Sequence, residues 1–247
     1  MTAPEVELSI VLPCYNEAPN LPLLLKRYND LRETFPFELI LVNNGSTDNS
    51  AAILAQELKK PEYRFAGVVT IEKNQGYGHG IMTGLREAKG RILAFSHADM
   101  QCDAKDVFIG YHKLIQNPDP ENVLVKGRRI RRQIGESLFT MGMTALATLI
   151  LRRTLADVNA QPKVFHKHLL EHFSDPPIGL EFDLYCLYSA RRLGIKIDTI
   201  PVYFTRRIHG ESKWAFNPMS KIRHILGMIR YMFQLAVSAD QKIRLAK

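Results

Sequence analysis

Three polar residues of different type alternate in residues 96–101, which read S-H-A-D-M-Q and follow a short apolar run. If this segment is extended, His97, Asp99 and Gln101 project to the same side, because successive side chains of an extended chain point to opposite faces. An imidazole, a carboxylate and an amide oxygen could hold a divalent cation whose other ligands are diphosphate oxygens. Mg²⁺ or Mn²⁺ suits such an oxygen-rich site. The segment taken alone also fits a loop of internally hydrogen-bonded polar residues.

A glycine-rich stretch, E-K-N-Q-G-Y-G-H-G, occupies residues 72–80 and precedes a helical pattern. Such a loop lets backbone N–H groups at a helix N-terminus approach a phosphate, so Asn74 and Gly76 are candidate donor-binding residues. The glycine spacing does not match the dinucleotide fingerprint G-x-G-x-x-G, and no Gly-Lys-Ser/Thr of a P-loop occurs. These two absences argue against a dinucleotide-dependent oxidoreductase and a Walker-type NTPase.

Two further polar turns follow apolar runs earlier in the chain. The first, residues 12–17, offers an aromatic face and polar groups to a base or ribose, and the second, residues 42–48, places Asn and Ser beside a helix N-terminus. Either one alone also fits an ordinary turn that leads into a helix. The residues of these turns that are expected to bind the donor are Pro13, Tyr15, Glu17, Asn44 and Ser46.

The elements that must position these loops alternate along the first half of the chain. Short apolar runs predict strands, and apolar residues at helical spacing predict the helices between them. A β-α-β-α order predicts an α/β fold whose mostly parallel sheet is flanked by helices, with the binding loops at the carboxyl ends of the strands. The expected strands are 8–12, 38–42, 65–71, 91–95 and 122–126, and the expected helices are 21–31, 48–58, 79–88, 137–151 and 222–236.

Composition limits the class of protein further. The 247 residues are 46% hydrophobic and 23% charged, which excludes disordered and collagen-like chains and fits a single domain over 1–247. Three widely separated cysteines predict a reducing compartment, and the absence of an apolar leader or a long apolar run predicts a cytoplasmic protein. A net charge of +8 calls for an anionic partner, namely nucleic acid, a membrane surface or a phosphorylated substrate. No nucleic-acid-binding motif is present, so nucleic acid is not expected.

The four polar segments together resemble one family. P-C-Y-N-E at 13–17, N-N-G-S-T-D-N-S at 43–50, N-Q-G-Y-G-H-G at 74–80 and H-A-D-M-Q at 97–101 have the order and spacing of family 2 glycosyltransferases with the GT-A fold. The closest resemblance is to the polyprenyl-phosphate branch, the dolichol-phosphate mannosyltransferase-like enzymes. It continues through segments 126–128, 159–161, 181–183 and 207–213. Two departures stand out, because Asn43 and Asn44 replace the usual Asp pair and His97 replaces the first Asp of the metal motif.

The resemblance implies metal-dependent, inverting transfer of a sugar from a UDP- or GDP-linked donor to a polyprenyl phosphate. Residues 1–120 would hold the donor, with His97 and Asp99 on its diphosphate, and residues 121–247 would hold the acceptor. An acceptor phosphate is already anionic, so it needs cations to position it and no general base. The implied catalytic residues are Asp99, Arg128 and Arg207, and the implied acceptor-binding residues are Arg128, Arg131, Gln161, Glu181, Arg207 and Lys213.

Two alternatives remain open. A transferase acting on a sugar or protein hydroxyl would need a base, and Glu181 or Asp183 could serve. A sugar-nucleotide-binding subunit with weakened catalysis would also explain Asn44 and His97.

Two apolar helical segments in the second half are flanked by cations. Residues 137–151 carry no charge, and a helix of this length reaches only about 22 Å, short of a ~30 Å hydrocarbon core. Residues 222–236 have an apolar stripe bordered by basic residues. Both features predict peripheral attachment to an anionic membrane at its cytoplasmic face. The alternatives are that these stripes are covered in a homodimer or by a membrane-anchoring subunit.

Overall fold

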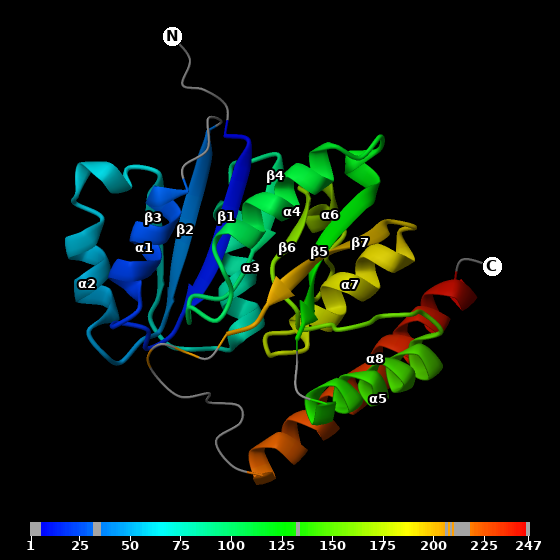
Figure 1. Cartoon of the computed structure of the whole chain (residues 1–247). Coiled ribbons are helices and arrows are strands. Elements are labelled where there is room, and N and C mark those ends of the chain that lie inside the picture. Colours follow the sequence, from blue (N-terminus) through cyan, green and yellow to red (C-terminus); the bar gives the residue numbers. More distant parts are fainter. Residues whose placement is uncertain are drawn as a thin grey trace. The chain divides into compact units, whose positions relative to one another are not determined.

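A computed structural model describes residues 6–31, 36–131, 134–205, 207, 209 and 218–245 of the chain, with side chains described outside 134–140, 218, 220–221 and 238–245. Lys213, expected at the acceptor, lies outside the described residues. The centre of the fold is a seven-stranded sheet in the order β3-β2-β1-β4-β6-β5-β7 (Figure 1). Its strands are β1 Leu8–Cys14, β2 Phe37–Asn44, β3 Ala66–Ile71, β4 Ile92–Phe95, β5 Val123–Ile130, β6 Lys163–His166 and β7 Lys196–Tyr203.

All neighbouring strands are parallel except β6, which is antiparallel to both β4 and β5. The predicted mostly parallel α/β sheet is therefore confirmed, and the five expected strands are all present. The helices are α1 Leu21–Asp30, α2 Ser50–Glu57, α3 Tyr77–Glu87, α4 Lys105–Ile115, α5 Ile134–Leu151, α6 His168–Glu171, α7 Phe182–Arg192 and α8 Pro218–Leu245, with short 3₁₀ turns η1 Pro61–Tyr63 and η2 Pro120–Asn122. The helices α4, α6 and α7 and the strands β6 and β7 were not predicted.

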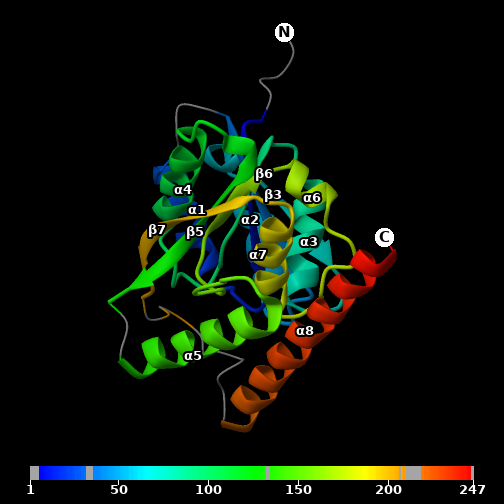
Figure 2. The ribbon, with the colours of Figure 1, turned by 90° about the vertical axis from the view of Figure 1, so that its right-hand side faces the viewer.

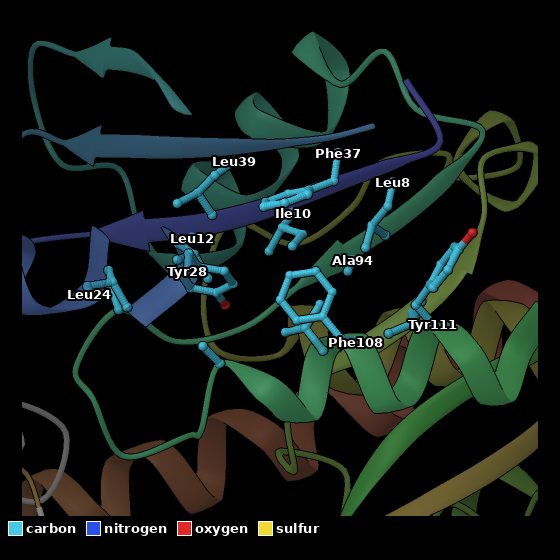
Figure 3. Close-up of a cluster of buried hydrophobic side chains, with 14 of the residues drawn as sticks. Leu8, Ile10, Leu12, Leu24, Tyr28, Phe37, Leu39, Ala94, Phe108 and Tyr111 are labelled. Atoms are coloured by element: carbon cyan, nitrogen blue, oxygen red, sulfur yellow. The ribbon is translucent and has the colours of Figure 1, made fainter. Parts of the chain in front are cut away.

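Helices cover both faces of the sheet. On one face, alternate residues of β1 pack with α1 and α4, and the Tyr28 and Phe108 rings lie 6.2 Å apart (Figure 3). On the other face lie α3 and α7, where the ring of Phe182 packs edge-on against Phe95 at 5.6 Å. Period-2 alternation explains why neighbouring residues of one strand supply both cores. The buried strands thereby hold the loops at their carboxyl ends in fixed positions.

Gly84 lets α3 approach the sheet closely. A Cβ at this position would lie 2.4 Å from Cγ1 of Val11 and 2.8 Å from Cγ2 of Val42. We expect Gly84→Ala to lower the free energy of unfolding by about 1–3 kcal/mol, because the added methyl overpacks the α3–sheet contact. Urea unfolding of the full chain measures this change.

Gly142→Ala in α5 is the matched control, because nothing lies within 4 Å of its Cβ position. Alanine favours a helix by up to ~1 kcal/mol over glycine, so this variant should be neutral or slightly more stable. Equal stability changes in the two variants would contradict the close packing of α3.

The chain divides into two compact units. The first comprises residues 1–131 and 160–210 and contains the sheet, and the second comprises residues 132–159 and 211–247. In the second unit α5 and α8 lie side by side (Figures 1 and 2). Of the helices that the structure describes, none combines the length and the apolar character needed to cross a bilayer.

Candidate active site

The loops that follow β1 and β2 are joined by hydrogen bonds at the carboxyl edge of the sheet. The backbone N–H of Asn16 donates to Oγ of Ser46 at 3.1 Å, and that of Glu17 donates to Oγ of Ser50 at 3.1 Å. Parallel pairing of β1 with β2 brings these two loops together. The two polar turns predicted from the sequence therefore form one continuous surface, with Tyr15 partly exposed on it.

The glycine-rich loop joins this surface through Asn44. Nδ2 of Asn44 donates to the carbonyl of Gly76 at 2.9 Å, and Oδ1 of Asn74 accepts from the backbone N–H of Gly76 at 2.8 Å. A carboxylate at position 44 could not donate to that carbonyl. Gly45 has a positive φ of 67°, and a Cβ there would lie 2.2 Å from the backbone nitrogen of Asn74. The replacement of aspartate by Asn44 thus has a local structural consequence, since the amide holds the glycine-rich loop.

The loop after β4 is bent. Met100 has a φ of 63°, and the backbone N–H of Gln101 turns back to donate to Oδ1 of Asp99 at 3.1 Å. The expectation of an extended segment with three residues on one side is therefore wrong, because a left-handed residue interrupts the alternation. Asp99 and Gln101 remain neighbours. His97 instead lies against Tyr77, with ring centroids 5.8 Å apart.

Arg207 lies directly on this loop. Its Nη2 is 2.8 Å from Oδ2 of Asp99, and its Nε donates to Oε1 of Gln101 at 3.1 Å. Thr205, two residues before it, donates its backbone N–H to the carbonyl of Gln101 at 3.0 Å. The expected division into a donor half at 1–120 and an acceptor half at 121–247 placed Arg207 apart from the donor loops, and its contacts with Asp99 and Gln101 correct this. A guanidinium is bound where Asp99 and Gln101 were expected to hold a cation.

A buried polar group lies next to these loops. Lys163 Nζ pairs with Oδ1 of Asp183, and the two side chains are 0% and 4% exposed. Nε2 of Gln161 donates to the same carboxylate oxygen at 2.9 Å and to the Tyr77 hydroxyl at 3.0 Å. Gln161, expected at the acceptor, is thus directed into the interior. Lys163 and Tyr77 were not among the predicted site residues; the place of Tyr77 in the glycine-rich stretch 72–80 was an available signal, whereas the strand that carries Lys163 was not predicted.

Charge and burial set the protonation of the site. Burial lowers the pKa of His97 below its ordinary value, although the carboxylates of Asp99 and Asp183 oppose this shift. A neutral imidazole at neutral pH can accept a hydrogen bond or bind a metal. Burial also raises the pKa of Tyr77, and the Asp183 carboxylate adds to this effect. Tyr77 therefore keeps its proton.

The remaining residues expected at the site lie on β1, on β5, just after β5 and just before α7. Arg128 is exposed on β5 and is paired in register with Pro201 of β7. The guanidinium of Arg131 lies 5.3 Å from the ring centroid of Tyr203. Glu181 is the N-cap residue of α7, and its carbonyl accepts the Tyr185 backbone N–H. The sheet edge also includes Pro13, whose Cβ lies 3.4 Å from where a Cβ of Gly80 would lie.

The oxygen ligands at the edge of the sheet fit a particular kind of metal site. Over the part of the chain that the structure describes, no three His, Cys, Asp or Glu side chains gather in a metal-binding group. Asp99 and Gln101 nevertheless offer a carboxylate and an amide oxygen on one loop. Mg²⁺ commonly takes one or two protein carboxylates and completes its shell with water and substrate phosphates. These residues therefore fit an ion shared with a diphosphate rather than one enclosed by protein.

Comparison with known proteins connects this arrangement to a family. The chain is 28% identical over 226 residues to the undecaprenyl-phosphate 4-deoxy-4-formamido-L-arabinose transferase of Photorhabdus laumondii, covering 89% of this chain and 66% of that one. It is 25% identical over 233 residues to the Yersinia enterocolitica transferase of the same name, with the same two coverages. The chain thus spans just under two thirds of the length of these relatives.

Solved structures show the same fold. Glucosyl-3-phosphoglycerate synthase from Mycobacterium tuberculosis, in complex with phosphoglyceric acid, aligns with a TM-score of 0.71 at 19% identity, covering 93% of this chain and 80% of that one. The same enzyme with Mn²⁺, UDP and glucosyl-3-phosphoglycerate aligns with a TM-score of 0.68 at 19% identity, covering 95% and 79%. The predicted GT-A fold is confirmed by these glycosyltransferase structures. Residues 9–169 match the sequence profile described as glycosyl transferase family 2, and the chain belongs to that family.

Proposed function

We propose that this chain transfers a sugar from a nucleotide-sugar to a polyprenyl phosphate. The observation that carries this choice of acceptor is that Asp183, the more buried of the two candidate bases Glu181 and Asp183, is paired with buried Lys163. A hydroxyl acceptor requires a base, whereas an anionic phosphate acceptor does not. The curated relatives named for undecaprenyl phosphate support the same acceptor class.

The donor occupies the joined loops at the carboxyl edge. Its nucleotide lies on the surface formed by Tyr15, Ser46 and the glycine-rich loop, and its diphosphate faces Asp99 and His97. Asp99 and Gln101 hold Mg²⁺ or Mn²⁺, which supplies charge neutralisation to the leaving diphosphate when bound. Neighbouring enzymes of this fold were crystallised with UDP and either Mn²⁺ or Mg²⁺, which supports this ion class.

Arginines position the acceptor. The guanidinium groups of Arg128, Arg131 and Arg207, together with Lys213, bind the lipid phosphate and direct an oxygen toward the anomeric carbon. Arginine suits this task because its planar fork contacts phosphate with two parallel hydrogen bonds. Attack from the side opposite the diphosphate inverts the anomeric configuration. Their contribution is therefore orientation and charge rather than proton transfer.

A substrate panel tests this function directly. The protein is incubated with undecaprenyl phosphate, MgCl₂ or MnCl₂, and UDP- and GDP-linked sugars in turn, followed by mass analysis of the lipid. One donor should yield a lipid-linked sugar. Donor hydrolysis or transfer to added hydroxyl acceptors, with no lipid product, would instead support the hydroxyl-acceptor alternative. Nucleotide binding without any transfer would support a sugar-nucleotide-binding subunit.

We further propose that the second unit attaches the enzyme peripherally to the cytoplasmic face of an anionic membrane. On α8, the side chains of Leu226 and Phe233 are 61% and 56% exposed. These two residues, with Arg230, help to line an open groove of about 610 Å³. An apolar helical face with basic residues beside it is suited to the interfacial zone of a bilayer.

We expect the double variant Leu226→Glu/Phe233→Glu to lose binding to vesicles of anionic lipid. Wild-type binding should weaken with salt, because each basic residue near the surface contributes roughly 1 kcal/mol. Co-sedimentation at low and high salt measures both effects. Ile109→Glu, which replaces a half-exposed apolar residue on α4, is the matched control and should still bind. Absence of wild-type binding at low salt would refute the proposal, and a homodimer detected by light scattering would favour the alternative cover.

A further inference from the structure

The buried group beside the donor loops comprises Tyr77, Gln161, Lys163 and Asp183, and we refer to it as the inner network. Lys163 is fully buried, and its ammonium lies 5.2 Å from the ring centroid of Phe95 as well as against the Asp183 carboxylate. An ammonium in such surroundings depends on its carboxylate, because a buried charge without a partner is costly. Removing either side chain alone would therefore leave the other as an unpaired buried charge.

Gln161 connects this ion pair to the donor loops. One of its amide hydrogens reaches Oδ1 of Asp183 and the other reaches the hydroxyl of Tyr77. Tyr77 is the first residue of α3 and lies within the glycine-rich stretch 72–80. Its ring also contacts His97 from the metal loop. A continuous set of contacts therefore runs from the buried ion pair to both segments that face the diphosphate.

The start of α7 supports the same end of α3. The backbone N–H groups of Gly78 and His79 donate to the carbonyls of Gly179 and Ile178, at 3.2 and 3.1 Å. A Cβ at Gly78 would lie 2.8 Å from Cβ of Phe182, the residue before Asp183. The glycine-rich loop and the segment that leads into α7 are therefore packed directly against each other.

These contacts are unsuited to a general base. A base must lie within hydrogen-bond reach of the acceptor proton, whereas the Asp183 side chain is 4% exposed. Its Oδ1 already accepts from Lys163 and Gln161. A proton on this carboxylate would leave the ammonium of Lys163 without a counter-charge.

We propose that Asp183 is a positioning residue for the donor: with Lys163 and Gln161 it fixes Tyr77, and through Tyr77 the glycine-rich loop and His97, in the arrangement that binds the diphosphate. The inference rests on the proposed function, because it assigns the network to the nucleotide-sugar side of that reaction. The positioning role requires that the charges at positions 163 and 183 balance. It does not require that Asp183 accept a proton.

The test is calorimetric titration of UDP, and separately of GDP, in MnCl₂ into four forms of the full chain: wild type, Asp183→Asn, Lys163→Met and the double variant. Each single variant should weaken nucleotide binding about tenfold or more, because one buried charge loses its partner. The double variant should bind within about threefold of wild type, since neither charge remains. Turnover at saturating donor should follow the same order.

A role of Asp183 as general base predicts a different pattern of affinities and turnover. If Asp183 removed a proton, nucleotide affinity would stay at the wild-type value, and removing Lys163 could not restore turnover to Asp183→Asn. Either result would overturn the proposal. If a single variant fails to fold, the double variant together with Tyr77→Phe and Tyr185→Phe still decides between the two roles.

Tyr77→Phe tests the connection while keeping the ion pair. It should weaken nucleotide binding several-fold with little change in the thermal midpoint, because it removes only the hydroxyl that joins Tyr77 to Gln161 and Asp183. Tyr185→Phe is the matched control, since its hydroxyl donates to the Ser174 carbonyl at 2.9 Å instead. Equal affinities in these two variants would contradict the inference. A wild-type chain that binds neither UDP nor GDP would instead contradict the proposed function itself.

Discussion

Replacing Asp99 with asparagine is expected to abolish sugar transfer while the protein stays folded. Asp99 is the sole carboxylate of the loop H-A-D-M-Q, because His97 stands where the family usually has a second acid. An asparagine has nearly the same shape but carries no negative charge for a divalent ion. We expect turnover to fall by at least roughly 10³-fold, equivalent to about 4 kcal/mol of transition-state stabilisation.

The measurement is initial-rate transfer with the donor identified by the substrate panel, together with circular dichroism to confirm folding. Asp103→Asn is the matched control, since Asp103 lies four residues on and receives the backbone N–H of Lys105. That variant should retain wild-type turnover. An Asp99→Asn enzyme with more than a tenth of wild-type turnover, or wild-type turnover undiminished by excess chelator, would show that no metal acts at this loop.

The sheet and the polar loops at its edge could be predicted from the sequence because their signals are local. Apolar runs such as 38–42 end directly at a polar turn, so strand and loop are defined within ten residues. The strand β6 has only two apolar residues, Val164 and Phe165, between Lys163 and His166, so it lacks the apolar run that marks the equally short β4. It was therefore missed.

The contacts within the site could not be predicted in the same way. Asp99 and Arg207 are separated by 108 positions, and only the completed fold brings them together. The bend at Met100 is an uncommon backbone conformation for a non-glycine residue, so the residue type gave no sign of it. Asp183 could be named as a candidate base, but its pairing with Lys163 depends on how α7 packs on β6.

Arg207→Ala is expected to lower turnover while strengthening the binding of metal and nucleotide. Arg207 donates to Oδ2 of Asp99 and Oε1 of Gln101, the same oxygens that would hold a divalent ion. Arginine and metal therefore compete for the same loop. Removing the guanidinium leaves the carboxylate without a counter-charge, so Mn²⁺ with UDP should bind several-fold more tightly.

The activation free energy of transfer should nevertheless rise by about 2–3 kcal/mol, the scale of a charge-assisted contact, so turnover should fall. Asp99 and Gln101 would hold the ion that neutralises the diphosphate, and the Arg207 guanidinium beside them would contact the acceptor phosphate. The same guanidinium thus balances the Asp99 carboxylate and positions the second substrate. Arg207→Lys should recover only part of the turnover, because lysine lacks the planar fork that contacts phosphate.

Calorimetry with Mn²⁺ and UDP, combined with initial rates over a range of lipid concentrations, separates the two effects. Arg91→Ala is the matched control, because Arg91 also pairs with a carboxylate, Glu7, at 2.6 Å, but before the start of β4 rather than after its end. It should change neither quantity. If Arg207→Ala weakens nucleotide binding in proportion to turnover, then Arg207 holds the donor diphosphate. Of the described arginines proposed for the acceptor phosphate, Arg128 and Arg131 would then remain.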